Sequence, residues 1–177
     1  WVPACGLAVS IVNLLVAHDG RSPAEAEMMR VLVPGGTLCL IGRDGQIRIT
    51  RAPWPDQIDQ WTHHLHGPDG NPVSRDTRVG PPRHYRWRAG PTWSRAHDTD
   101  SVISAMVTAG GRIFYILDEA PTGTVGNHEL PDKWSLVARD AFNGVVLWKR
   151  PIAEWGWRQW KRTWYARRPH NLPVNLP

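Results

Sequence analysis

The sequence predicts a mainly β chain in which a short β-α-β unit precedes one four-stranded antiparallel sheet. Two apolar runs flank a helix-forming segment within the first fifty residues. Four β-branched or alternating runs follow residue 100, and an Asn-Gly pair joins the last two of them. With 177 residues, of which 41% are hydrophobic and 21% charged, the chain has enough apolar residues for a folded core.

The first expected strand is the apolar run at residues 8–17, and its continuity predicts burial on both faces. A helix should follow, because Ser22 is a good N-cap, Pro23 suits the first helical position and Glu25 completes a capping box. We expect this helix to run through Leu32 and to end at the Val-Pro-Gly-Gly segment that begins at residue 33.

Residues 37–41 form the next apolar run, which predicts a second buried strand. A strand, a helix and a strand in succession form the crossover unit of a parallel sheet. The segment from 51 to 100 is rich in Pro, Gly, Asp and Arg and has little periodicity, so we expect a loop-rich linker there.

The four expected strands of the second sheet lie at residues 101–108, 112–117, 134–140 and 145–149. Asn143 and Gly144 predict a tight turn between the last two strands, and Asp140 stands where its carboxylate can cap that turn. Gly144 is expected to adopt a positive φ. One four-stranded sheet should therefore span about residues 101–152.

The helix-turn-strand segment at residues 30–38 resembles the late part of class I S-adenosylmethionine-dependent methyltransferases. That resemblance implies that residues 1–50 are the C-terminal part of a methyltransferase-like α/β domain. The glycine-rich cofactor loop and the acidic ribose-binding residue of that family match nothing in this chain. Methyl transfer by this chain alone is therefore not expected.

The segment at residues 136–148 is similar to the repeat of pyrroloquinoline-quinone (PQQ)-type, or quinoprotein-like, β-propellers. In that repeat a strand ending in Ala-x-Asp leads through a Gly-containing turn to a strand ending in Trp, here Trp148. The resemblance implies that residues 101–177 hold the first blade and its connection, so that the fold is a partial propeller. Because a ring needs four to eight blades, the expected partners are the remaining blades of a parent chain or another protein.

A wider resemblance covers residues 59–71, 79–83 and 138–144. It is to large planctomycete-type bacterial proteins that place a methyltransferase-like segment before a quinoprotein-like propeller. We therefore expect a fragment of such a protein, acting as a binding or assembly scaffold and periplasmic or secreted by analogy. A fragment of a quinone-dependent dehydrogenase and a fragment of a methyltransferase stay open as alternatives, so enzyme activity and any cofactor are left undecided. Asp140 is expected to be structural rather than catalytic.

A cluster of His63, His64 and His66 is the densest group of potential metal ligands in the sequence. Together, His63, His66 and His97 could form a zinc, iron or manganese site. Asp69, Asp98 or Asp100 could add carboxylate ligands. The alternative is a polar loop with solvent-exposed imidazoles.

Charge is uneven along the chain, whose formal net charge is +5. The C-terminal segment interleaves cationic residues with Trp155, Trp157, Trp160 and Trp164, a pattern that also occurs where proteins grip single-stranded nucleic acid. We favour a connection between blades and do not expect a nucleic-acid partner. No apolar run reaches the length of a membrane span. The two cysteines, Cys5 and Cys39, exclude a disulfide scaffold.

Overall fold

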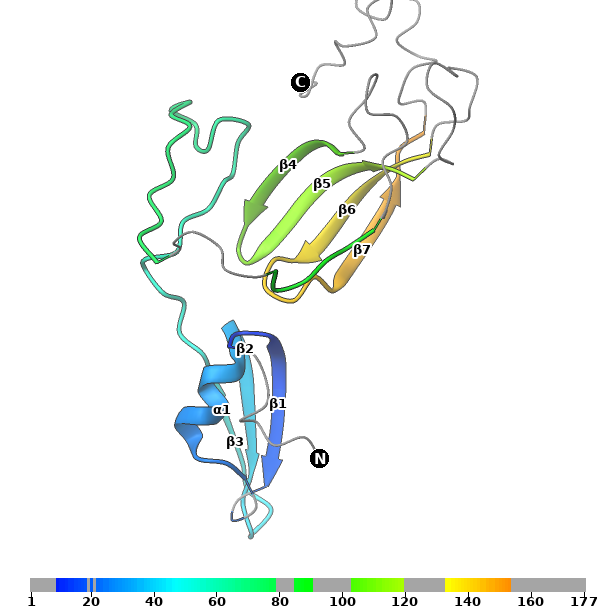
Figure 1. Ribbon diagram of the computed structural model, residues 1–177. Coiled ribbons are helices and arrows are strands. Elements are labelled where there is room, and N and C mark those ends of the chain that lie inside the picture. The colour runs from blue at the N-terminus through cyan, green and yellow to red at the C-terminus, as the bar shows by residue number, and fades with distance from the viewer. Residues whose placement is uncertain are drawn as a thin grey trace, which may run out of the picture. The chain divides into compact units, whose positions relative to one another are not determined.

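The computed structural model describes residues 9–18, 20, 22–78, 85–90, 103–119 and 133–153. These residues are mainly β and form a three-stranded and a four-stranded sheet (Figure 1). The chain falls into two compact units. Unit 1 lies within Trp1–Asp59 and Arg75–Arg86, and unit 2 lies within Gln60–Ser74 and Trp87–Pro177. The segment expected to be a linker therefore contributes residues to both units.

Unit 1 contains β1 (Val12–His18), α1 (Glu25–Val31), β2 (Leu32–Ile41) and β3 (Ile47–Arg51). β1 pairs with β2 in parallel, as the strand-helix-strand pattern predicts. β2 pairs with β3 antiparallel, which makes the sheet mixed. β3 was not expected from the sequence, and it follows a tight turn in which Gly42 N–H donates to the carbonyl of Gln46.

The helix begins later than its capping signal predicts. Ala24 is the N-cap residue, and no side chain caps the helix. The capping-box prediction is wrong because Ser22 lies two residues further upstream, where its Oγ donates to the carbonyl of His18 at 2.5 Å. The first turn keeps two acidic residues, Glu25 and Glu27, which the positive end of the helix favours.

The Pro34-Gly35-Gly36 segment lies inside β2, although the sequence predicts a turn that precedes the strand. The helix ends earlier, at Val31, and Leu32 is already extended. Gly35 has φ of 76°, and its N–H donates to the carbonyl of Ala52 at 3.0 Å. The three residues therefore form an irregularity within the strand, which shifts its register against β1.

The core of unit 1 lies between α1 and one face of its sheet. Met28, Leu32, Leu38 and Ala52 are buried there, with partly buried residues of β1 packed against them. The opposite face is open: Leu14 and Val16 are 58% and 57% exposed. The prediction that the first strand is buried on both faces is therefore wrong for the described residues.

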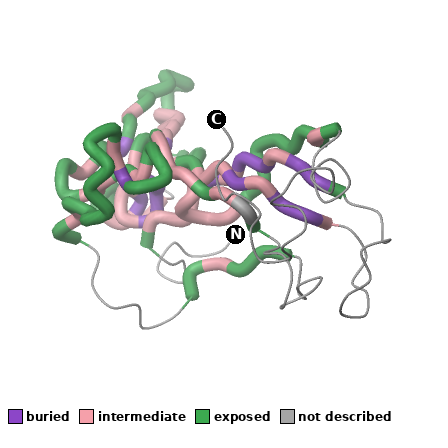
Figure 2. The backbone as a smooth tube through the Cα atoms, turned by 90° about the horizontal axis from the view of Figure 1, so that it is seen from above, coloured by how far each residue is buried: buried purple, intermediate pink, exposed green. Residues whose placement is uncertain are grey.

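Unit 2 contains β4 (Ile103–Ala109), β5 (Arg112–Asp118), β6 (Trp134–Asp140) and β7 (Val146–Pro151). Each strand pairs antiparallel with the next, so the sheet has the order β4-β5-β6-β7. Buried positions gather in β5 and β6, whereas every residue of β7 is exposed (Figure 2). These four strands confirm the four-stranded sheet expected between residues 101 and 152.

Among the described residues, no helix has the length and apolarity required to cross a membrane.

Candidate functional site

The turn between β6 and β7 is organised by the side chain of Asp140, which is only 7% exposed. Its Oδ1 accepts hydrogen bonds from the backbone N–H of Phe142 at 2.8 Å and of Asn143 at 3.1 Å. The backbone of Asp140 also closes the hairpin, since its N–H donates to Val145 and its carbonyl accepts from Gly144. The turn-capping role predicted for this carboxylate is confirmed.

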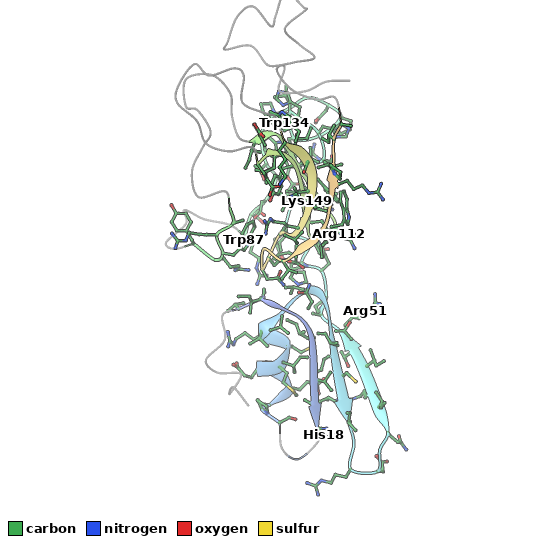
Figure 3. All side chains as sticks on the ribbon, turned by 90° about the vertical axis from the view of Figure 1, so that its right-hand side faces the viewer. His18, Arg51, Trp87, Arg112, Trp134 and Lys149 are labelled. Carbon is green, nitrogen blue, oxygen red and sulfur yellow. The ribbon has the colours of Figure 1, made fainter. Side chains whose placement is uncertain are left out.

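Gly144 occupies a place where any side chain would be strained. Its φ is 76°, and a Cβ built there would lie 2.6 Å from Cδ2 of Trp87. The indole N–H of Trp87 donates to the carbonyl of Ala141 at 3.0 Å, so the ring is fixed across the turn (Figure 3). Trp87 belongs to the segment expected to be a linker, and no local sequence signal predicts this contact.

Arg139 connects the same turn to the core of unit 2. Its Nη1 donates to the carbonyl of Gly144 at 2.7 Å, and its Nε donates to the hydroxyl of Tyr115 at 2.6 Å. Tyr115 is 5% exposed and packs with Leu117 and Val137. The guanidinium therefore joins a buried phenol on β5 to the glycine carbonyl of the turn.

A segment preceding the sheet docks on the edge strand β4. The N–H of Thr108 donates to the carbonyl of Trp61 at 2.6 Å, and the hydroxyl of Thr108 accepts from the N–H of Trp61 at 2.8 Å. At the adjoining turn, the N–H of Gly110 donates to Oε1 of Gln60 at 2.7 Å. These contacts satisfy backbone groups at one end of the β4 edge.

The histidine cluster lies directly after this docked segment. His63 and His66 form an isolated antiparallel bridge, and the carbonyl of His66 accepts from the N–H groups of Thr62 and His63. His66 has φ of 69° and is 5% exposed, and its ring meets the ring of Trp61 edge-on with centroids 5.2 Å apart. His64 stays exposed, and its carbonyl accepts from the Trp61 indole N–H.

The structure thus brings together two of the three expected metal ligands. The imidazole of His63 is exposed, and its Nδ1 lies 2.8 Å from the hydroxyl of Thr62. His97, Asp98 and Asp100 lie outside the described residues. Within the described part of the chain, no three His, Cys, Asp or Glu side chains are grouped so that they could hold a metal ion. The site formed by His63, His66 and His97 stays a prediction.

One face of the four-stranded sheet carries an aromatic pair, in which Phe114 is half-buried and Trp148 is exposed. Phe114 on β5 and Trp148 on β7 lie either side of Ala138, with ring centroids 6.0 Å apart. The guanidinium of Arg150 lies 5.6 Å from the centre of the Trp148 ring, within the range of a cation–π contact. Trp148 remains 39% exposed. The expected tail tryptophans from Trp155 onward lie outside the described residues.

An ion pair links α1 to β3 in unit 1. Arg48 donates from Nη1 and Nη2 to the two carboxylate oxygens of Glu25, at 3.2 and 2.9 Å. These hydrogen bonds, followed by the charge of the guanidinium, lower the pKa of Glu25 from its ordinary value. Arg30 lowers the pKa of Glu27 in the same way within the helix. Both pairs lie at the surface of the helix.

Comparison with known proteins found no match: no known family, curated protein or solved structure matches this chain. The functional assignment therefore depends on the geometry of the two units. In unit 2 that geometry combines a capped turn with an exposed tryptophan, and in unit 1 it leaves one sheet face open.

Proposed function

We propose that the chain is part of a PQQ-like β-propeller repeat protein and acts as a binding or assembly scaffold. The observation that carries the proposal is the four-stranded antiparallel sheet whose last hairpin is closed by the Asp140 turn. Strand number, strand order and turn chemistry agree with what the repeat pattern at residues 136–148 implies. Unit 1 has the parallel crossover that a remnant of a methyltransferase-like domain would retain, and we extend the proposal to it.

The buried carboxylates of unit 2 favour a scaffold over a catalyst. Asp118 accepts the N–H of Lys133 at 3.1 Å, and Asp140 accepts two N–H groups of its own turn. Both side chains are at most 7% exposed. A carboxylate held by backbone donors stabilises a loop, whereas a general acid or base must reach the reacting proton.

The surface that would meet a partner is the face of β5 to β7 that carries Phe114 and Trp148. Trp148 can bury a large area at little cost in side-chain entropy, which is why tryptophan is frequent at the centre of interfaces. Val107 of β4 pairs with Phe114 and therefore lies on the same face. Packing against a further sheet would remove this apolar surface from water.

Analytical ultracentrifugation over a concentration series tests the proposal. We expect the chain to self-associate through this face, and Trp148→Lys to raise the dissociation constant by about tenfold or more. Trp54→Lys is the matched control, because Trp54 is a tryptophan of similar exposure, 37%, in unit 1.

A chain that stays monomeric at every concentration would contradict a scaffold that assembles through unit 2. Equal effects of the two tryptophan substitutions would contradict the assignment of the surface, because Trp54 does not belong to the four-stranded sheet.

A further inference from the structure

The open face of the sheet in unit 1 is apolar at its centre. Register places Val16, Cys39 and Ile49 in one row across the three strands, with Leu14 and Ile47 in adjoining rows. Ile47 and Ile49 are 63% and 67% exposed, comparable with Leu14 and Val16. Among the described segments none covers this face, while α1 covers the other (Figure 3). Four exposed aliphatic side chains thus lie together on one face of the sheet, where a partner could cover them.

The covered face shows how this sheet binds a helix. α1 inserts Met28 among the apolar residues of the sheet, and its Glu25 forms a two-pronged ion pair with Arg48 of β3. On the covered face, the helix thus supplies an apolar stripe and a carboxylate. The sheet supplies apolar residues and an arginine of its edge strand.

Arg51 gives the open face the same combination. Arg48 opposes Leu40 and Arg51 opposes Thr37, so the two arginines of β3 point to opposite faces of the sheet. Arg51 is exposed, and among the described residues it has no ion-pair partner. The open face therefore pairs four exposed aliphatic side chains with a positive charge at its edge.

The dimensions of the face match those of a single helix. Three strands at about 4.8 Å spacing, paired over five residues of about 3.3 Å, present roughly 240 Å². A single helix is about 10 Å wide and spans the length of this face in about eleven residues.

We infer that the open face of β1, β2 and β3 binds an amphipathic helix of a partner protein, with a carboxylate of that helix paired to Arg51. The apolar residues of the helix cover Leu14, Val16, Ile47 and Ile49. This inference concerns unit 1 and is independent of the assembly face proposed for unit 2.

Titration of the ¹⁵N-labelled chain with a synthetic helical peptide tests the inference by NMR. The probe is an Ala/Leu/Glu peptide of about 18 residues, long enough to be partly helical, with Leu on one face and Glu beside it. We expect saturable shifts of the β1 and β3 amides. Ile49→Lys should weaken binding by about tenfold or more, because it places a charge in the apolar contact. Ile103→Lys, at an isoleucine 44% exposed in unit 2, is the control and should leave binding unchanged.

Reversal of the charge at Arg51 distinguishes an ion pair with the peptide carboxylate from nonspecific apolar binding. Arg51→Glu should weaken the Glu peptide and strengthen a peptide of the same design with Lys in place of Glu. Absence of saturable shifts, or shifts that Ile49→Lys leaves unchanged, would overturn the inference. So would ultracentrifugation in which the free chain forms a dimer that Ile49→Lys disperses, because the occupant would then be a second copy. Loss of the Trp148-dependent association would leave this result untouched.

Discussion

Gly144 carries two separate constraints, one from its backbone and one from its neighbour. Its positive φ disfavours any L side chain, and the Trp87 ring fills the space that a Cβ would need. Gly45, in the turn between β2 and β3, has φ of 81° but nothing within 4 Å of a Cβ. A comparison of the two glycines therefore distinguishes the cost of backbone strain from the cost of a steric clash.

We expect Gly45→Ala to lower the free energy of unfolding by about 1–2 kcal/mol, the cost of left-handed backbone alone. Gly144→Ala should cost more, because the Trp87 ring must also move. Urea denaturation of both variants gives the comparison, and Gly144→Ala should lower the free energy of unfolding by less when it is introduced into Trp87→Ala than into the wild-type chain. Equal losses for the two single glycine variants would show that Trp87 does not restrict the turn.

Asp140→Ala should lower the free energy of unfolding by about 1–3 kcal/mol, because two turn N–H groups lose their acceptor. Asp69→Ala is the control, since its carboxylate accepts the N–H of Asn71 in an exposed turn and water can replace it. Denaturant titration followed by circular dichroism measures both. If Asp140→Ala lowered the free energy of unfolding no more than the control does, the structural role assigned to Asp140 would be contradicted.

At the scale of elements, the sequence predicts structure well where the pattern is local. The parallel crossover, the four strands of unit 2 and the Asp140 turn follow from apolar runs and turn residues within a few positions of each other. The helix start was wrong because Ser22 bonds to His18 instead of capping α1. β3 was missed because its residues are mostly exposed and pair only through the sheet.

In the candidate site, too, local contacts could be predicted from the sequence, whereas contacts between distant residues could not. Asp140 could be assigned because its partners lie two and three residues away, whereas Trp87 reaches Ala141 across 54 residues and Trp61 reaches Thr108 across 47. No single-sequence pattern encodes such distant contacts. The pairing of His63 with His66 is local, but it depends on the positive φ of His66, which no residue pattern in the sequence predicts.

The ion pair between α1 and β3 makes the stability of unit 1 depend on pH. Arg48 lowers the pKa of Glu25, so the pair stabilises the fold above the ordinary glutamate pKa, and this contribution disappears as the pH falls through the lowered value. Between pH 7 and pH 3, the wild-type chain should therefore lose more stability than Glu25→Gln does. Thermal unfolding across this range measures the difference, and Arg48→Met should reproduce the flatter profile. Parallel profiles for all three proteins would contradict the assignment.

For the whole molecule, net charge opposes the association of exposed apolar faces. The formal charge is +5 at pH 7, and the isoelectric point calculated from the sequence is 9.8. Repulsion between copies should vanish as the pH approaches that point. Light scattering should therefore show an average mass that rises between pH 7 and about pH 10, with a smaller rise for Trp148→Lys. A mass independent of pH would show that charge does not limit association.

The docked Trp61 segment has a consequence for how the four-stranded sheet can grow. A sheet has two edges, and here the β4 edge is engaged at Thr108 while every residue of β7 remains exposed. An extra strand can therefore add next to β7 more readily than next to β4, so the two edges of the sheet are not equivalent. Pairing of β7 with the β7 of a second copy would leave only the engaged β4 edges at the outside, so such pairing would end at a closed pair instead of continuing into a fibril.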